Sequence, residues 1–250
     1  MESSNLKGTA ALVTGASRGL GAALARRLGR AGARLALVAR GGEALEAVAR
    51  EIRAAGGEAH AVPGDVGDKR DAHRIAGAAA ALVGPLEVVV HNASTLGATP
   101  LVPLLETDCE DLERALAVNL VGPFRLTKIV AGAMAARGRG LVVHVSSDAA
   151  VAAYPRWGAY GVSKAAQDHL GRILAAELEG TGVRVVSVDP GEMNTRMHAE
   201  AIPDADPAAL ADPDAVAARL VALIARPALV ASGGRVELER LSEPAAEGRP

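Results

Sequence analysis

Tyr160 and Lys164 are the two residues of this sequence whose types and spacing are best suited to chemistry. Side chains four residues apart share one face of a helix, so a helical segment would bring the lysine ammonium beside the phenol. That positive charge favours the phenolate and is expected to lower the pKa of the phenol from its usual value of about 10. Such a phenol can act as general acid or base when an alcohol and a carbonyl interconvert. A surface tyrosine packed on a lysine stem is the alternative interpretation of the pair taken alone.

A glycine-rich stretch at residues 14–21 is the second feature with chemical meaning. Gly15, Gly19 and Gly21 follow an apolar run and open a helical one. Glycines let the main chain approach a pyrophosphate, and a helix N-terminus supplies free N–H groups and a positive dipole end. The spacing differs from the G-x-G-x-x-G pattern, so the prediction of a dinucleotide site depends on the position of the loop in the first strand–helix unit.

The end of the second apolar run indicates which dinucleotide is bound. An acidic residue there would hydrogen-bond the ribose of NAD, but the run ends at Arg40 and the next acidic residue is Glu43. Arg40 and Arg18 offer two guanidiniums for a 2′-phosphate, which favours NADP(H) over NAD(H). The alternative is that both arginines are solvated loop residues.

Composition excludes several classes of function. The net charge is −2 and the chain has one cysteine, Cys109, in 250 residues. We therefore expect no nucleic-acid partner, no internal disulfide and no thiolate metal cluster. The six histidines show no metal-ligand spacing, and His91 and His144 end apolar runs, so buried histidines are expected there rather than metal ligands. The chain begins with no secretory leader pattern and no apolar run approaches 18 residues, so we expect a cytoplasmic protein that does not bind a membrane.

Apolar runs alternate with helical stretches along the whole chain. Strands are predicted at residues 9–13, 34–39, 58–62, 87–91, 141–146, 183–188 and 235–238, and helices at 20–31, 43–55, 68–83, 108–136, 157–179 and 213–225. The runs are continuously apolar, as in parallel strands buried on both faces. This order predicts one α/β domain over residues 1–241, a Rossmann-type doubly wound parallel sheet of about seven strands with helices on both faces.

Local patterns refine this organisation. Glycines 32, 56, 138 and 180 stand where helices should end, and Thr107 with Glu110 forms a predicted capping box. Residues 192–212, rich in Pro, Asp and Ala, are predicted to form a loop or small lid. Residues 242–250 are polar and are expected to be a flexible tail.

With these motifs in place, the sequence resembles the classical short-chain dehydrogenase/reductase family over nearly its whole length. Residues 14–21 match the family pattern T-G-x-x-x-G-x-G, and the Tyr160–Lys164 pair matches its Y-x-x-x-K. Pro190, Gly191 and Thr195 match its P-G-x-x-x-T turn. His91-Asn92-Ala93-Ser94 stands where the family usually has N-N-A-G, so His91 and Ser94 depart from the pattern. Trp157 and the stretches at 160–168 and 195–197 also look like the sepiapterin-reductase-like branch, although Asn194 replaces its common Asp.

The resemblance implies a set of catalytic residues. Ser147 lies thirteen residues before Tyr160, the family's usual separation, whereas Ser146 is one residue off it. Tyr160 would be the general acid or base, Lys164 would lower its pKa and bind the nicotinamide ribose, and Ser147 would orient the substrate oxygen. Asn119 would hold a water that links Lys164 to solvent, or else be an ordinary mid-helix asparagine.

The resemblance also implies the residues that bind the cofactor. They are Gly15, Ser17, Arg18, Gly19, Leu20, Gly21, Arg40, Asp65, Val66, Asn92, Ala93, Tyr160, Lys164, Pro190, Gly191, Met193 and Thr195. Asp65 would contact the adenine, and the 190–195 turn would grip the nicotinamide carboxamide.

The few aromatic residues suggest where the substrate binds. Three of the four, Tyr154, Trp157 and Tyr160, fall within seven residues of one another. We expect Tyr154 and Trp157, with Met193 and Met197 opposite, to line a pocket for a small apolar or aromatic ketone or alcohol. The alternative is that these aromatics pack a helix against a loop or lie in a subunit contact.

These observations together predict an NADP(H)-dependent oxidoreductase that interconverts a carbonyl and an alcohol. Family members form dimers and tetramers through long helices like the two expected here, so a homodimer or homotetramer is expected. The alternatives are a dehydratase or epimerase of the same family, and a non-enzymatic NADP-binding sensor, which would usually have lost the tyrosine or the lysine.

Overall fold

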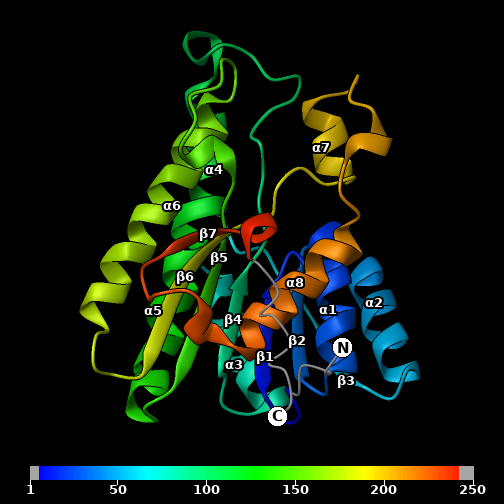
Figure 1. The fold of residues 1–250 in the computed structure, drawn as a ribbon, viewed down its shortest axis with the longest axis vertical. Coiled ribbons are helices and arrows are strands. Elements are labelled where there is room, and N and C mark those ends of the chain that lie inside the picture. Colours follow the sequence, from blue (N-terminus) through cyan, green and yellow to red (C-terminus); the bar gives the residue numbers. More distant parts are fainter. Residues whose placement is uncertain (1–5, 242–250) are drawn as a thin grey trace, which may run out of the picture.

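Seven parallel strands form the centre of the protein in the order β3-β2-β1-β4-β5-β6-β7 (Figure 1). The structure is a computed structural model that describes residues 6–241. The strands are β1 (Ala10–Thr14), β2 (Arg34–Ala39), β3 (Glu58–Pro63), β4 (Val88–His91), β5 (Gly140–Val145), β6 (Val183–Asp189) and β7 (Arg235–Glu237). The order reverses between β1 and β4, which are neighbours in the sheet although β2 and β3 intervene in the chain. Such a switch point, at the carboxyl ends of the strands, is where ligands bind in sheets of this kind.

Side chains of the central strands point alternately to two apolar layers. In β1, Ala11 and Val13 pack into one layer, and Ala10 and Leu12 pack into the other. All four are buried, because a parallel strand in the middle of a doubly wound sheet is covered on both faces.

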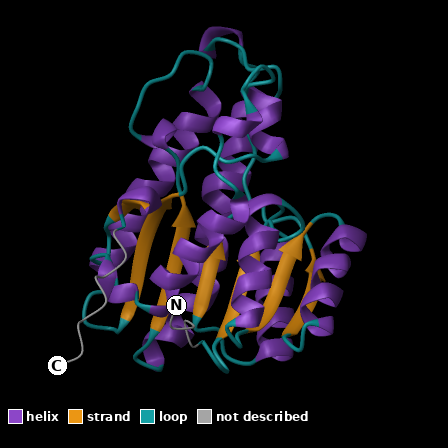
Figure 2. Ribbon diagram, turned by 45° about the vertical axis from the view of Figure 1, so that its right-hand side comes forward, coloured by secondary structure: helices purple, strands orange, loops and turns teal. Residues whose placement is uncertain are grey.

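Helices cover both faces of the sheet (Figure 2). Residues of α1 (Gly19–Arg30), α2 (Gly42–Ala54) and α8 (Pro213–Ala225) fill the first apolar layer. Residues of α3 (Asp71–Val83), α5 (Gly122–Ala136) and α6 (Gly158–Glu177) fill the second. The predicted Rossmann-type fold is confirmed.

The helix predicted at residues 108–136 has an interruption. It consists of α4 (Cys109–Leu116), a π-helical turn (Ala117–Val121) and α5. At the joint, a Cβ on Gly122 would lie 2.5 Å from the main-chain oxygen of Val66, so only glycine fits against the loop after β3. The predicted capping box is wrong: Asp108 is the N-cap residue, and the Thr107 hydroxyl donates to the main-chain oxygen of Pro103 at 3.2 Å.

The same helical segment bears on the prediction of no membrane binding. Cys109–Ala136 is 28 residues long and apolar enough, by length and composition, to cross a membrane, although polar and charged residues interrupt it. It is the only described segment with this property, and 44% of its most apolar window is buried inside the protein. Core helices of folds like this one meet the same criterion, so the segment is weak evidence for a membrane span.

The remaining predictions concern the C-terminal third. Residues 192–212 contain the short helix α7 (Arg196–Ala201), which stands beyond the carboxyl edge of the sheet (Figure 1). Main-chain bonds between Asn194 and Ala211, and between Ala211 and Glu192, close this segment at its base. The prediction of a flexible tail at 242–250 lies outside the described residues.

Candidate active site

Gly15 and Gly21, at the two ends of the glycine loop, lie where neighbouring atoms leave no room for a Cβ. A Cβ on Gly21 would lie 2.5 Å, and one on Gly15 2.7 Å, from Nδ2 of Asn92. Gly15 also has a left-handed φ of 68°. Arg18, the N-cap residue of α1, makes no capping hydrogen bond, and the first turn has no acidic residue. The first N–H groups of α1 therefore remain available to an anion, and the loop fits the pyrophosphate of a dinucleotide.

Asn92 and Ala93 fix this loop from the neighbouring strand end. The Asn92 amide donates to the main-chain oxygens of Thr14 at 2.9 Å and Gly15 at 3.2 Å. The main-chain N–H groups of Asn92 and Ala93 both donate to the Thr14 hydroxyl at 3.0 Å. Asn92 thus acts on the glycine loop itself, because its amide is committed to the carbonyl groups of that loop.

The other predicted cofactor residues surround the same edge. Arg18, the N-cap residue of α1, and Arg40, directly after β2, are exposed. Leu20 is buried in the first turn of α1, and Ser17 is half-buried. After β3, Asp65 accepts a hydrogen bond from the main chain of Gly67 at 2.9 Å, and Val66 is buried.

The turn at residues 190–195 follows β6 and faces the glycine loop. Gly191 has a φ of 73° and donates its N–H to Oδ1 of Asp189 at 3.0 Å. Thr195 caps α7 by accepting from the N–H of His198 at 3.2 Å. A Cβ on Gly19 would lie 3.5 Å from Cγ2 of Thr195, so the turn and the loop are in reach of one ligand.

Ser147 and Tyr160 come together because α6 packs closely on the turn that follows β5. A Cβ on Gly161 would lie 2.9 Å from the main-chain oxygen of Ala149, so only glycine allows this approach. Tyr160 is buried in a small cluster with Ala149 and Leu96. The Ser147 hydroxyl donates to Oδ1 of the exposed Asp148 at 2.8 Å and accepts from the Ala149 N–H at 3.2 Å.

The Tyr160 phenol is neutral at ordinary pH in this arrangement. Burial raises its pKa to about 12, and the neighbouring hydroxyls of Ser147 and Ser94 act in the opposite direction. The expectation that Lys164 lowers this pKa is therefore wrong for the protein as described. Its Nζ lies 5.6 Å from the centre of the phenol ring and donates instead to the main-chain oxygen of Val145 at 2.7 Å.

Lys164 is itself almost fully buried. Burial lowers its pKa to about 8, and the negative charge of Asp168, one helical turn further on, acts in the opposite direction. The Gln167 side chain accepts a second, longer hydrogen bond from Nζ at 3.4 Å.

Asn119 lies in the π-helical turn and joins two parts of the site. Its Nδ2 donates to the Thr95 main-chain oxygen and to the Ser163 hydroxyl, both at 2.8 Å. Its Oδ1 accepts from the Ser94 hydroxyl at 3.1 Å and the Thr95 N–H at 2.9 Å. These four bonds use its full capacity and hold the loop after β4 against α6. A role in holding water remains a prediction.

The predicted pocket residues separate into two groups. Trp157 and Met197 pack against the cluster that contains Tyr160, and the Trp157 and Tyr160 rings meet edge to face with centroids 5.8 Å apart. Tyr154 is exposed and its hydroxyl donates to Oδ2 of Asp148 at 2.9 Å. Met193 packs instead against the large apolar layer of α1 and α8.

His91 and His144 are buried neighbours behind the site. They are register partners on β4 and β5, with ring centroids 5.2 Å apart. His91 hydrogen-bonds the Thr127 hydroxyl at 2.9 Å, whereas His144 has only a weak contact with the main chain of Gln167 among the described residues. Burial and the charge of Lys164 lower the pKa of His144 to about 4, and burial also lowers the pKa of His91.

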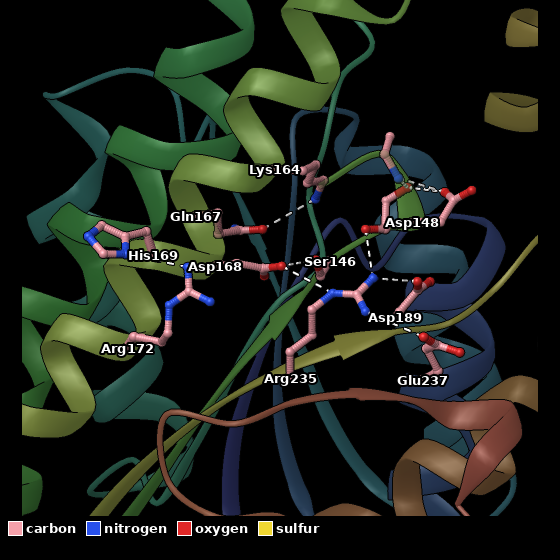
Figure 3. A network of polar contacts seen from close by, with 12 residues as sticks. Ser146, Asp148, Lys164, Gln167, Asp168, His169, Arg172, Asp189, Arg235 and Glu237 are labelled. Atoms are coloured by element: carbon pink, nitrogen blue, oxygen red, sulfur yellow. Dashed lines mark hydrogen bonds and ion pairs between the residues drawn. The ribbon is translucent and has the colours of Figure 1, made fainter. Parts of the chain in front are cut away.

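A buried charged network around Arg235 was not predicted from the sequence (Figure 3). It joins Arg235 of β7 to Asp168 of α6 and to Asp189 at the end of β6. Two patterns could have indicated it: Asp168 follows Lys164 at helical spacing, and Asp189 directly precedes the Pro190-Gly191 turn. Ser94, where the sequence departs from the family pattern, lies beside Tyr160 and donates to Asn119.

Known proteins with similar sequences are oxidoreductases. The family model for short chain dehydrogenases matches residues 9–206. D-threitol dehydrogenase of Mycolicibacterium smegmatis is 35% identical over 192 residues, which cover 77% of this chain and 73% of that protein. Glycine betaine reductase of Emericella nidulans is 34% identical over 247 residues, which cover 96% of this chain and 19% of that much longer protein.

Solved structures agree with the sequence relatives. A short chain dehydrogenase from Pseudomonas syringae is 32% identical, with a TM-score of 0.88 over 95% of this chain and 97% of its own. A metagenomic short-chain oxidoreductase in complex with NADP is 37% identical, with a TM-score of 0.76 over 88% and 91% of the two chains. A 7 alpha-hydroxysteroid dehydrogenase complexed with NADH is 26% identical, with a TM-score of 0.86 over 94% of each chain. With its fold, its glycine loop and its Tyr160–Lys164 pair, the chain belongs to the short-chain dehydrogenase/reductase family of oxidoreductases.

Proposed function

We propose that this protein is an NADP(H)-dependent oxidoreductase that interconverts a carbonyl and an alcohol, with Tyr160 as the general acid or base. One observation carries the proposal. A buried phenol lies beside the Ser147 hydroxyl, at the sheet edge where the glycine loop fits a dinucleotide. A bound nicotinamide would supply the hydride in reduction and accept it in oxidation.

The residues of the chain then handle the proton and the orientation. In reduction, the phenol of Tyr160 gives its proton to the substrate oxygen as that oxygen gains charge, and in oxidation the phenolate takes the proton back. Ser147 would orient the substrate oxygen by a hydrogen bond, and its O–H, which donates to Asp148 in this structure, would turn from that carboxylate to donate to a carbonyl oxygen. Lys164, one helical turn after Tyr160, would bind the nicotinamide ribose.

A preference for NADP(H) rests on Arg18 and Arg40. Both residues are exposed, Arg18 at the start of α1 and Arg40 directly after β2, and the position that would carry an acid for an NAD ribose is an arginine. The neighbour that was solved with NADP is the more similar in sequence of the two cofactor complexes described above.

The remaining proposals concern the substrate and the assembly. Trp157 and Met197, packed against Tyr160, support a small apolar or aromatic ketone or alcohol as substrate. Phe124 on α5 and Val162 and Ile173 on α6 are exposed apolar side chains, which supports the predicted homodimer or homotetramer.

Turnover of NADPH with a panel of apolar and aromatic ketones tests this function, by following the absorbance of the reduced nicotinamide. We expect the wild type to turn over at least one ketone, and faster with NADPH than with NADH. Tyr160→Phe should lower kcat by ~10²–10⁴-fold, because the proton donor is lost, and leave the Kd for NADPH nearly unchanged. Equal turnover by this variant would contradict the role of Tyr160. Tight NADPH binding without turnover across the panel would favour a sensor.

A further inference from the structure

Arg235 reaches from the last strand into the site from below (Figure 3). It is the first residue of β7, which pairs with the end of β6 at the edge of the sheet. Its side chain is 17% exposed, so most of the guanidinium is removed from water.

The guanidinium contacts three separate segments of the chain. Its Nη2 donates to Oδ2 of Asp189 at 2.6 Å and to the main-chain oxygen of Ser147 at 2.9 Å. Its Nε lies 3.3 Å from Oδ2 of Asp168, an ion pair in which the N–H is not aligned for a hydrogen bond. Only the planar fork of an arginine can serve these oxygens at once, because a lysine offers a single point of contact.

The two carboxylates depend on this cation. The side chains of Asp168 and Asp189 are 5% and 7% exposed. Burial raises the pKa of Asp189, while the Gly191 N–H and Arg235 act in the opposite direction. Without the guanidinium, two buried carboxylates would face each other with no cation between them, an arrangement that proteins avoid by moving or protonating the groups.

Each contact leads to a residue of the proposed mechanism. The Ser147 peptide carries the hydroxyl that orients the substrate, and Ser146 next to it donates to Oδ2 of Asp168 at 2.7 Å. On the other side, Asp189 holds the N–H of Gly191 in the turn proposed to grip the nicotinamide. The C-terminal segment also touches this turn directly, since a Cβ on Gly191 would lie 2.9 Å from Oε1 of Glu239.

We infer that Arg235 is a positioning residue: it fixes the Ser147 peptide relative to the turn at residues 190–195, and so sets the distance between the substrate oxygen and the nicotinamide. This inference rests on the proposed function. The competing interpretation is an ion network that stabilises the fold and leaves the geometry of the site unaffected.

Three arginine substitutions separate the two interpretations. Arg235→Met removes the guanidinium, and Arg235→Lys keeps the charge without the fork. Arg27→Met is the matched control, because Arg27 forms a half-buried ion pair with Asp214 that joins α1 to α8 away from the site. For each protein we would measure kcat and KM with saturating NADPH, the Tm, and the crystal structure of the variant.

A positioning role predicts a loss in kcat that stability does not explain. Displacing reacting groups by about 1 Å can cost ~100-fold, so we expect Arg235→Met to lose about that factor in kcat with KM changed only a few-fold. Arg235→Lys should recover part of the loss, and Arg27→Met should lose Tm but not kcat. The crystal structure of Arg235→Met should show the Ser147 peptide shifted away from residue 191.

Two outcomes would overturn the inference. Normal kcat in Arg235→Met at temperatures where it is folded would leave only the structural role. If the wild type turned over no ketone, the proposed function would fail, and the crystal structure of the variant would still decide whether Arg235 positions Ser147. An unmoved Ser147 peptide would then refute the positioning role. If Arg235→Met did not fold, Arg235→Lys would carry the same two measurements.

Discussion

Individual side chains in this site owe their chemistry mainly to burial. Tyr160 and Lys164 are both almost fully buried, and their pKa values move toward neutrality of the side chain, to about 12 and about 8. A phenol with a raised pKa holds its proton at ordinary pH, so it is ready to donate but must be deprotonated before it can accept. The two directions of the reaction should therefore respond differently to pH.

Alcohol oxidation should accelerate with rising pH while ketone reduction stays nearly level. Well below a pKa of about 12, the phenolate fraction of Tyr160 rises about tenfold per pH unit, and this fraction is the base in oxidation. The measurement is kcat/KM in both directions between about pH 6 and pH 7.5, where Lys164, with a pKa of about 8, stays mostly charged, with saturating cofactor. Reduction that rose with pH as steeply as oxidation would contradict Tyr160 as the proton donor.

Residue identities were predictable where a motif fixes their spacing. Ser147, Tyr160 and the glycines of the loop after β1 lie where the sequence placed them, at one edge of the sheet. The direction in which the pKa of Tyr160 shifts was not predictable from the sequence. The spacing shows that an ammonium is near, but it does not show how deeply the phenol is buried, nor that the ammonium of Lys164 donates to the main-chain oxygen of Val145. Arg235 was missed for a related reason: 88 residues separate it from Ser147, and only the sheet brings them together.

At the level of whole elements, close approach of main chains determines the shape of the site. The α1 loop, the π-helical turn before α5 and the start of α6 each place a glycine where a Cβ would meet main-chain atoms. The sequence predicted the seven strands and the helices that cover the sheet to within a few residues, but not α7, which lies in the segment predicted as a loop or lid. It did not predict the π-helical turn, because nothing in the apolar periodicity of residues 108–136 marks a widened turn.

Gly21→Ala should abolish the fit of the dinucleotide loop, because its Cβ would collide with Asn92 and with the main chain of Gly15. We expect a loss of NADPH affinity of at least ~10-fold, read by binding titration, together with lower stability. Gly77→Ala is the matched control. It lies inside α3 with open space around the new Cβ, so it should gain about 0.5–1 kcal/mol of stability and keep its affinity. Equal NADPH affinity in the two variants would contradict the proposal that the glycine loop binds the dinucleotide.

The whole molecule carries an acid-sensitive pair in its core. His91 and His144 are buried with lowered pKa values, about 4 for His144, against an unfolded value of about 6.5. Between these values the unfolded chain binds more protons than the folded one, so stability falls as pH falls. Each such histidine contributes a slope of about 1.4 kcal/mol per pH unit.

His144→Leu should reduce the slope of the unfolding free energy against pH by about 1.4 kcal/mol per pH unit between about pH 6 and pH 4.5. It also removes a buried imidazole whose hydrogen bonding is largely unsatisfied, so stability at neutral pH should hold or rise. Urea unfolding across this pH range measures both effects. His73→Gln, which removes an exposed histidine of α3, is the control and should leave the slope unchanged. An unaltered slope in His144→Leu would show that His144 is not the group being protonated.

Trp157 also gives the molecule a built-in optical reporter. It is the only tryptophan of the chain, and its ring lies 5.8 Å from that of Tyr160. Its emission therefore comes from the site alone and overlaps the absorption of a reduced nicotinamide. Energy transfer from the Trp157 indole to the nicotinamide should therefore report the binding of the cofactor. It should also report any movement of the indole when substrate binds, in the unlabelled protein and before any product is formed.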